Sequence, residues 1–215
     1  MRNAIARTAF TAIATLAAAV AFAAPTAELK VTGVIKPPAC TPNLAAGGVV
    51  DYGIIPASSL TAGQNKKLET RQVDLSITCD GPAKMSVKFT DNRASSRVAG
   101  ITGRATDPYN FGLGAVAGKN VGGYALSFDA NSTVDGVAAR NIYSGDNGRT
   151  WNGGVVYLQH DGQLFSFGNG SNLPVAFKQL NAKINVETTL NKPENLPLSQ
   201  DVPLDGSTTI EVNYL

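Results

Sequence analysis

The stretch RQVDLSITCDGPAKMSVKFTD, residues 71–91, decides the fold because its apolar residues recur at every second position. In its first half the apolar face carries Val73, Leu75 and Ile77, with polar residues between them. This alternation predicts a half-buried strand that ends at Cys79. Asp80-Gly81 indicates a turn, after which the alternation resumes with Met85, Val87 and Phe89 facing inward.

The same period of two runs through most of the remaining chain. It is clear in residues 122–130, 173–190 and 204–215, and weaker in residues 27–36 and 48–56. Residues 155–170 predict a hairpin around Asp161-Gly162, and residues 92–123 predict loops with one short strand. No segment has the apolar stripe of a helix. The sequence therefore predicts an all-β, antiparallel Greek-key sandwich.

The N-terminus has the features of a secretory signal peptide. Arg2 and Arg7 precede an apolar run, and Ala21-Phe22-Ala23 forms an A-x-A cleavage signal. The run is too short and too Ala-rich to predict a membrane anchor. We expect residues 1–23 to be the signal, cleaved after Ala23 or Ala24, and residues 24–215 to form one domain. We therefore expect the protein to be exported to the periplasm.

The mature chain carries no net charge and no further membrane-spanning segment is predicted. The 16 acidic residues balance the 18 Lys and Arg once Arg2 and Arg7 are removed. A neutral surface argues against nucleic acid or an anionic membrane as the partner. The sequence contains no phosphate-binding loop, dinucleotide motif or metal cluster, so no cofactor and no metal are expected.

Two cysteines, Cys40 and Cys79, lie in the exported part. In an oxidising compartment an even count predicts one disulfide. A metal pair and a reactive nucleophile are the alternatives, and with one His in the chain a metal pair is disfavoured.

Residues 142–151, IYSGDNGRTW, place Ser144, Asp146, Gly148, Thr150 and Trp151 at the spacing of an Asp box, a motif of sialidase propellers. A sialidase needs several repeated blades, and this chain has one box and no internal repeat. We therefore expect a structural turn in which Asp146 accepts amide hydrogen bonds and Trp151 packs. An exposed Trp151 that stacks on a sugar is the alternative.

Other polar residues are expected to be structural. His160 should lie in water at the tip of the 155–170 hairpin, and no Ser or carboxylate spacing marks it as the base of a triad. Arg93, Arg97 and Arg104 are expected in a solvated loop. These expectations point to a protein that is not an enzyme.

Several segments, in order, resemble subunits of pili assembled by the bacterial chaperone–usher route. They are GVIKPPAC (33–40), VVDYGIIPASSLTAG (49–63), VDLSITCD (73–80), GGYALSFD (122–129), LPVAFKQLNA (173–182) and IEVNYL (210–215), with Tyr214 penultimate. The chain looks closer still to a little-characterised group of secreted pilin-like proteins with an Asp-box-like segment. The resemblance implies an immunoglobulin-like sandwich that lacks its last strand.

The resemblance also implies a groove beside the C-terminal strand, lined by Ile210, Val212, Tyr214 and Leu215. A periplasmic chaperone fills such a groove first, and the N-terminal extension of another subunit then replaces it through an usher. The donor extension of this chain would use Ala27, Leu29 and Val31, a shorter set than major pilins carry. An ordinary last strand in a closed sandwich is the alternative.

The expected function is therefore that of a structural fimbrial or pilin-like subunit with a role in cell adhesion, in the periplasm or at the cell surface. The alternatives are a carbohydrate-binding adhesin or tip module, with a host or surface glycan as its partner, and a sialidase-like glycan hydrolase.

Overall fold

The computed structural model describes residues 25–36, 38–104, 107–154, 157–170 and 172–215, and the signal peptide predicted over residues 1–23 lies outside them. The chain divides into two units, Met1–Lys36 and Pro37–Leu215. In the first unit, residues 25–36 are exposed and form no strand, so the strand predicted from their weak alternation is wrong. An isolated extended segment has no partner for its backbone groups and remains solvated.

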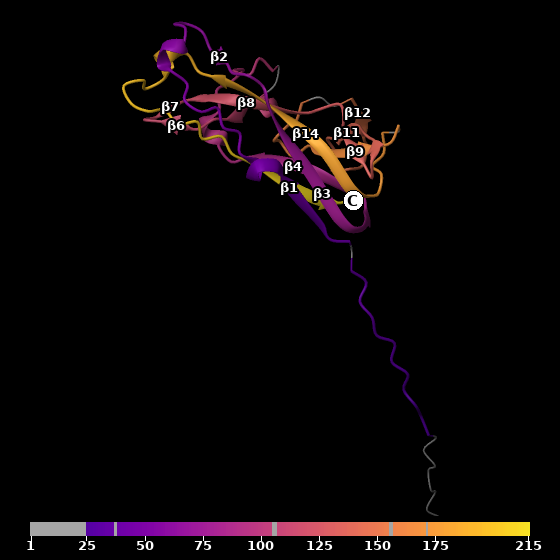
Figure 1. The fold of residues 1–215 in the computed structure, drawn as a ribbon. Coiled ribbons are helices and arrows are strands. Elements are labelled where there is room, and N and C mark those ends of the chain that lie inside the picture. Colours follow the sequence, from indigo (N-terminus) through magenta and orange to yellow (C-terminus); the bar gives the residue numbers. More distant parts are fainter. Residues whose placement is uncertain (1–24, 37, 105–106, 155–156, 171) are drawn as a thin grey trace, which may run out of the picture. The chain divides into compact units, whose positions relative to one another are not determined.

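The second unit is an all-β sandwich of two antiparallel sheets, which confirms the predicted fold class (Figure 1). The larger sheet has the order β1-β3-β14-β8-β5, with β2 and β9 also paired to β14 and β10 paired to β9. Its strands are β1 (Cys40–Leu44), β2 (Lys66–Lys67), β3 (Arg71–Ala83), β5 (Phe111–Gly112), β8 (Gly122–Phe128), β9 (Thr133–Val134), β10 (Val137–Ala138) and β14 (Phe177–Leu190).

The smaller sheet has the order β12-β11-β13-β4-β15, so β15 forms one of its edges. Its strands are β4 (Met85–Asp91), β11 (Arg140–Ser144), β12 (Asn152–Gly153), β13 (Leu164–Gly168) and β15 (Thr208–Tyr214). A separate two-stranded ribbon pairs β6 (Ala115–Val116) with β7 (Lys119–Asn120).

The described helices are single 3-10 turns. They are η1 (Ala45–Gly48), η2 (Ala57–Ser59), η3 (Ala94–Ser96), η4 (Asp107–Tyr109) and η5 (Pro193–Asn195). Within the described ranges no helix has the length and apolar character needed to cross a bilayer.

The decisive stretch of sequence links the two sheets. The predicted alternation is present in β3 and continues to Ala83, so the strand does not end at Cys79 and Asp80-Gly81 is not a turn. The Asp80 carboxylate accepts the amide of Ala39 at 2.8 Å, which adds a contact between β3 and the residue before β1. The chain then passes through Lys84 alone into β4 of the other sheet.

Aromatic rings from both sheets meet in the centre of the sandwich. The ring centroid of Phe128, on β8, lies 6.0 Å from that of Phe89 on β4 and 5.3 Å from that of Phe167 on β13. These edge-on contacts join residues that are far apart in sequence. They fix the spacing of the two layers.

Two other predicted elements are wrong. Residues 48–56 form no strand, because Gly53 takes a left-handed φ of +63° and its amide bonds the Asp51 carboxylate at 2.8 Å. The hairpin around Asp161-Gly162 is also wrong: Tyr157 bridges to Ser127 of the larger sheet, whereas β13 pairs within the smaller one. Val155 and Val156 lie outside the described residues.

The predicted disulfide is confirmed. Cys40 on β1 and Cys79 on β3 are directly opposite in the register of the two strands and are bonded to each other. The bond therefore fastens the edge strand of the larger sheet to its neighbour.

Replacing both Cys40 and Cys79 by Ala should lower the free energy of unfolding by about 4 kcal/mol, because the unfolded chain gains the freedom of a loop of roughly 40 residues. Denaturant unfolding of the mature protein measures the change. Reduced wild-type protein is the control and should match the double variant. Equal stability of oxidised and reduced wild type would contradict this expectation.

Candidate functional site

A groove opens between the two sheets beside β15. Its cavity has a volume of about 180 Å³ and is lined by the chain that follows β1, by the inner face of the larger sheet, and by β15 with the segment before it. The apolar part of this lining includes Leu44, Val50, Val73, Leu126, Ile184 and Ile210. We call it the groove cavity.

One end of the groove cavity is lined by hydroxyl groups. The Tyr124 hydroxyl lies 2.6 Å from Thr208 Oγ1, and the Tyr52 hydroxyl donates to Thr188 Oγ1 at 3.1 Å. Burial raises the pKa of the Tyr124 phenol above its usual range, so the group stays protonated and can act as a donor. Each hydroxyl pair meets its own hydrogen-bonding needs. This end of the groove cavity can therefore accommodate an apolar or small side chain.

The backbone of β15 has an unpaired edge along this cavity. At the ends of its ladder with β4, the Asn92 amide donates to Ser207 O and the Leu215 amide donates to Lys84 O, each at 3.0 Å. The register between these bonds has no shift. Alternate residues of an antiparallel edge strand point their amides away from the neighbour. The outward amides are therefore those of Thr208, Ile210, Val212 and Tyr214, and no described strand pairs on that side.

The four C-terminal residues named from the sequence have different environments. Ile210 lines the groove cavity, and Val212 is partly buried against the core further along β15. Tyr214 and Leu215 are each 49% exposed. The Tyr214 hydroxyl accepts the amide of Cys40 at 2.8 Å, so it joins the edge strands of the two sheets.

The three residues named as a donor strand lie in the first unit. Ala27, Leu29 and Val31 are exposed, and Leu29 and Val31 are each 90% exposed. No described residue of this segment belongs to a sheet. Its apolar side chains are therefore available to another molecule.

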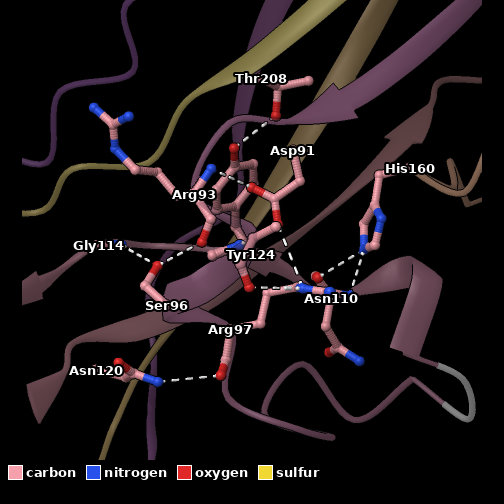
Figure 2. Close-up of polar contacts among 12 residues, drawn as sticks. Asp91, Arg93, Ser96, Arg97, Asn110, Gly114, Asn120, Tyr124, His160 and Thr208 are labelled. Atoms are coloured by element: carbon pink, nitrogen blue, oxygen red, sulfur yellow. Dashed lines mark hydrogen bonds and ion pairs between the residues drawn. The ribbon is translucent and has the colours of Figure 1, made fainter.

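A polar cluster lies behind the hydroxyl-lined end (Figure 2). The buried Asp91 carboxylate accepts the amides of Arg93 at 2.9 Å and Gly112 at 3.1 Å, and lies 3.8 Å from Arg97 Nε. Two amide donors and the nearby Arg97 cation satisfy this buried carboxylate without an external ligand. Sequence reasoning missed this cluster because its members come from two strands and the loop between them.

The solvated positions expected for His160 and the arginines are corrected in part: the arginines lie in loops, but all four side chains are partly buried and have partners. His160 packs edge-on against Phe111, and its Nε2 lies 3.2 Å from both Arg97 Nη1 and the carbonyl oxygen of Asn110. Arg93 makes two hydrogen bonds to Asp205, and Arg104 bonds Glu187 at 2.8 Å. Opposite charges distant in sequence hold these side chains in place.

The Asp-box residues form the predicted turn. The Asp146 carboxylate accepts the Thr150 hydroxyl at 2.6 Å, the Thr150 amide at 2.9 Å and the Ser144 hydroxyl at 2.7 Å. These hydrogen bonds, led by those of Thr150, hold the pKa of Asp146 well below its usual range. Gly148 takes a φ of +83° and donates its amide to Ser144 Oγ at 2.8 Å.

The turn packs against the C-terminus. A Cβ atom on Gly148 would lie 3.6 Å from the Trp151 ring and 3.7 Å from Leu215. The half-buried Trp151 donates its indole N–H to Gly148 O at 3.1 Å. The Asp box thus supports the end of β15.

Among the described residues, no group of three or more His, Cys, Asp or Glu side chains could hold a metal ion. The turn's hydrogen bonds are those of a folded loop.

Asp146→Ala should lower the melting temperature at neutral pH, because the Thr150 and Ser144 donors lose their acceptor. The folded-state pKa is depressed, so this stabilisation is present above the unfolded value of about 3.9 and is lost as the pH falls below it. Melting curves at several pH values measure the difference from wild type, with Arg149→Ala as the control. A difference that persists unchanged in acid would contradict the assigned hydrogen bonds.

Comparison with the sequences of known proteins identifies the family of this chain. The chain is 29% identical over 223 residues to "Protein GltF" of Escherichia coli (strain K12), covering 87% of this chain and 88% of that protein. It is 26% identical over 219 residues to "Uncharacterized protein YhcF" of the same organism, covering 87% and 89%. The model of the family described as "Protein of unknown function (DUF1120)" matches residues 29–139, just over half of the chain. The chain belongs to the DUF1120 family.

Proposed function

We propose that the protein is a structural, pilin-like subunit whose groove is completed by an extended strand from another polypeptide. The partner is first a periplasmic chaperone and then another subunit, delivered through an usher. The resulting fibre or surface assembly would serve cell adhesion.

The free edge of β15 beside an apolar cavity is the observation that carries this proposal. An unpaired edge with outward N–H and C=O groups is a template for strand addition, and apolar pockets beside it give the added strand its affinity. A cavity of roughly 150 Å³ holds a benzene-sized group, so the 180 Å³ of the groove cavity suits one large or two small apolar side chains.

The disulfide gives the groove a firm rim. It ties β1 to β3, and the amide of Cys40 is held by Tyr214 from the opposite sheet. The rim and β15 are therefore fixed before a partner arrives, which lowers the ordering cost of binding. The same two cysteines and the penultimate Tyr214 carried the resemblance to pilus subunits.

The exposed donor residues suit a subunit that also donates. Leu29 and Val31 are apolar, exposed and two positions apart, which matches the period of an added strand. Their burial in a neighbouring groove would remove this apolar surface from water.

Ile210→Asp should abolish a one-to-one complex of the mature chain with a chaperone–usher periplasmic chaperone from the same bacterium, because it would bury an unpaired charge. The control is Thr209→Asp, which adds the same charge on the exposed side of β15 and should retain the complex. Co-expression followed by size-exclusion chromatography measures it, and thermal melting checks that both variants fold.

Expressed alone, the wild-type mature chain should self-associate or precipitate. A cooperative monomer with no affinity for such a chaperone would contradict the proposal and would indicate a closed sandwich.

A further inference from the structure

A second cavity adjoins the groove. It has a volume of about 540 Å³ and lies between residues 53–60 and residues 196–204. Its apolar lining includes Ile54, Leu60, Leu196 and Leu198. Leu204 lines this cavity and the groove cavity alike, so the two cavities adjoin at this residue. We call the second one the loop cavity.

The loops around this cavity are held in place, yet they leave apolar side chains in solvent. The Gly63 amide donates to Glu194 at 2.7 Å, and Lys66 Nζ donates to Ser59 O at 3.0 Å. Ile54 is 97% exposed and Leu198 is 40% exposed. Apolar side chains kept exposed at the rim of a formed cavity mark a docking surface.

We propose that the loop cavity binds Ile35 of a second copy of this chain, whose residues 27–33 lie antiparallel along β15. The inference rests on the proposed function and adds the partner's identity, the direction of its strand and its anchor outside the groove.

The two ends of the groove set the direction. At one end the Tyr214 hydroxyl accepts the Cys40 amide and links the edges of the two sheets. At the other end, past Thr208, Leu204 leads into the loop cavity. Ile35 follows the inserted residues in the chain and must reach the loop cavity beyond Thr208, which requires a strand antiparallel to β15.

Side-chain size sets the register. With Ala27 opposite Tyr214, the apolar Leu29 and Val31 lie opposite Val212 and Ile210, and Gly33 lies opposite Thr208. Glycine has no side chain to displace the Thr208–Tyr124 pair, whose oxygens are 2.6 Å apart. A shift of two residues would instead place Ile35 against that pair and would leave the loop cavity empty.

The next residue whose side chain points to the same side of the inserted strand is Ile35, which is 101% exposed in the free chain. It follows Gly33 by two positions, or about 7 Å along an extended strand. That step carries it past the end of β15 toward Leu204. Val34 is also exposed, at 82%, but it points to the opposite side of the strand.

The test uses the mature chain, residues 24–215, and measures self-association by sedimentation velocity after long incubation. Ile35→Asp and Leu198→Asp should each weaken association roughly tenfold or more, because each would bury a charge. The controls are Val34→Asp, in the opposite phase, and Val137→Asp, at an exposed apolar site on β10. Both should change association by less than about twofold, and melting curves check folding.

A second measurement locates the contact. Copies with Ile35→Cys mixed with copies with Leu198→Cys should form an interchain disulfide, and copies with Val34→Cys should form it roughly tenfold more slowly.

The outcomes separate the two proposals. If Leu29→Asp abolishes association while Ile35→Asp and Leu198→Asp do not, the loop-cavity contact is wrong and strand addition stands. If neither Leu29→Asp nor Ile210→Asp weakens association, strand addition between copies is wrong as well. A mature chain that stays monomeric at every concentration overturns the second-copy assignment, and the chaperone experiment then decides the proposed function.

Discussion

The one-sided pairing of β15 with β4 is the constraint on which the rest of the groove depends. Because β15 ends the smaller sheet, half of its amides point away from any described strand, and they belong to Thr208, Ile210, Val212 and Tyr214. The apolar side chains of Ile210 and Val212 turn inward on the same residues. β15 therefore presents free backbone hydrogen-bonding groups and apolar side chains at the same residues, which is the combination that an added strand requires.

Local alternation was sufficient to predict the fold class, and it failed where contacts distant in sequence decide. The strand through Val73, Leu75 and Ile77 follows from the sequence because one of its faces is buried along its whole length. Its continuation past Cys79 does not, because Ala39 supplies the partner for Asp80 from another segment. Residues 48–56 alternate weakly, and the left-handed Gly53 prevents a strand.

The candidate site divides in the same way. Cys40, Cys79 and the Asp-box residues were found from the sequence because their chemistry is carried by residue type and short spacing. The buried Asp91 with Arg97, and the hydroxyl pair of Tyr124 and Thr208, join residues from separate strands and loops. Single-sequence patterns contain no signal for such pairs. The loop cavity was missed for the same reason, since residues 53–60 and 196–204 meet only in the folded chain.

The Asp box has a physical use here that needs no sugar chemistry. Asp146 fixes Thr150, and Ser144 holds the amide of Gly148, so Gly148 keeps the left-handed conformation that sets the turn against Leu215. Leu215 in turn donates its amide to Lys84 and ends the ladder of β15. With Tyr214 bonded to Cys40, the last two residues of the chain are held from two sides. An edge strand anchored at its C-terminal end can stay in register while its outward amides remain unpaired, and the disulfide on the facing rim holds β1 to β3. The turn and the disulfide thus act on the same groove from opposite sheets.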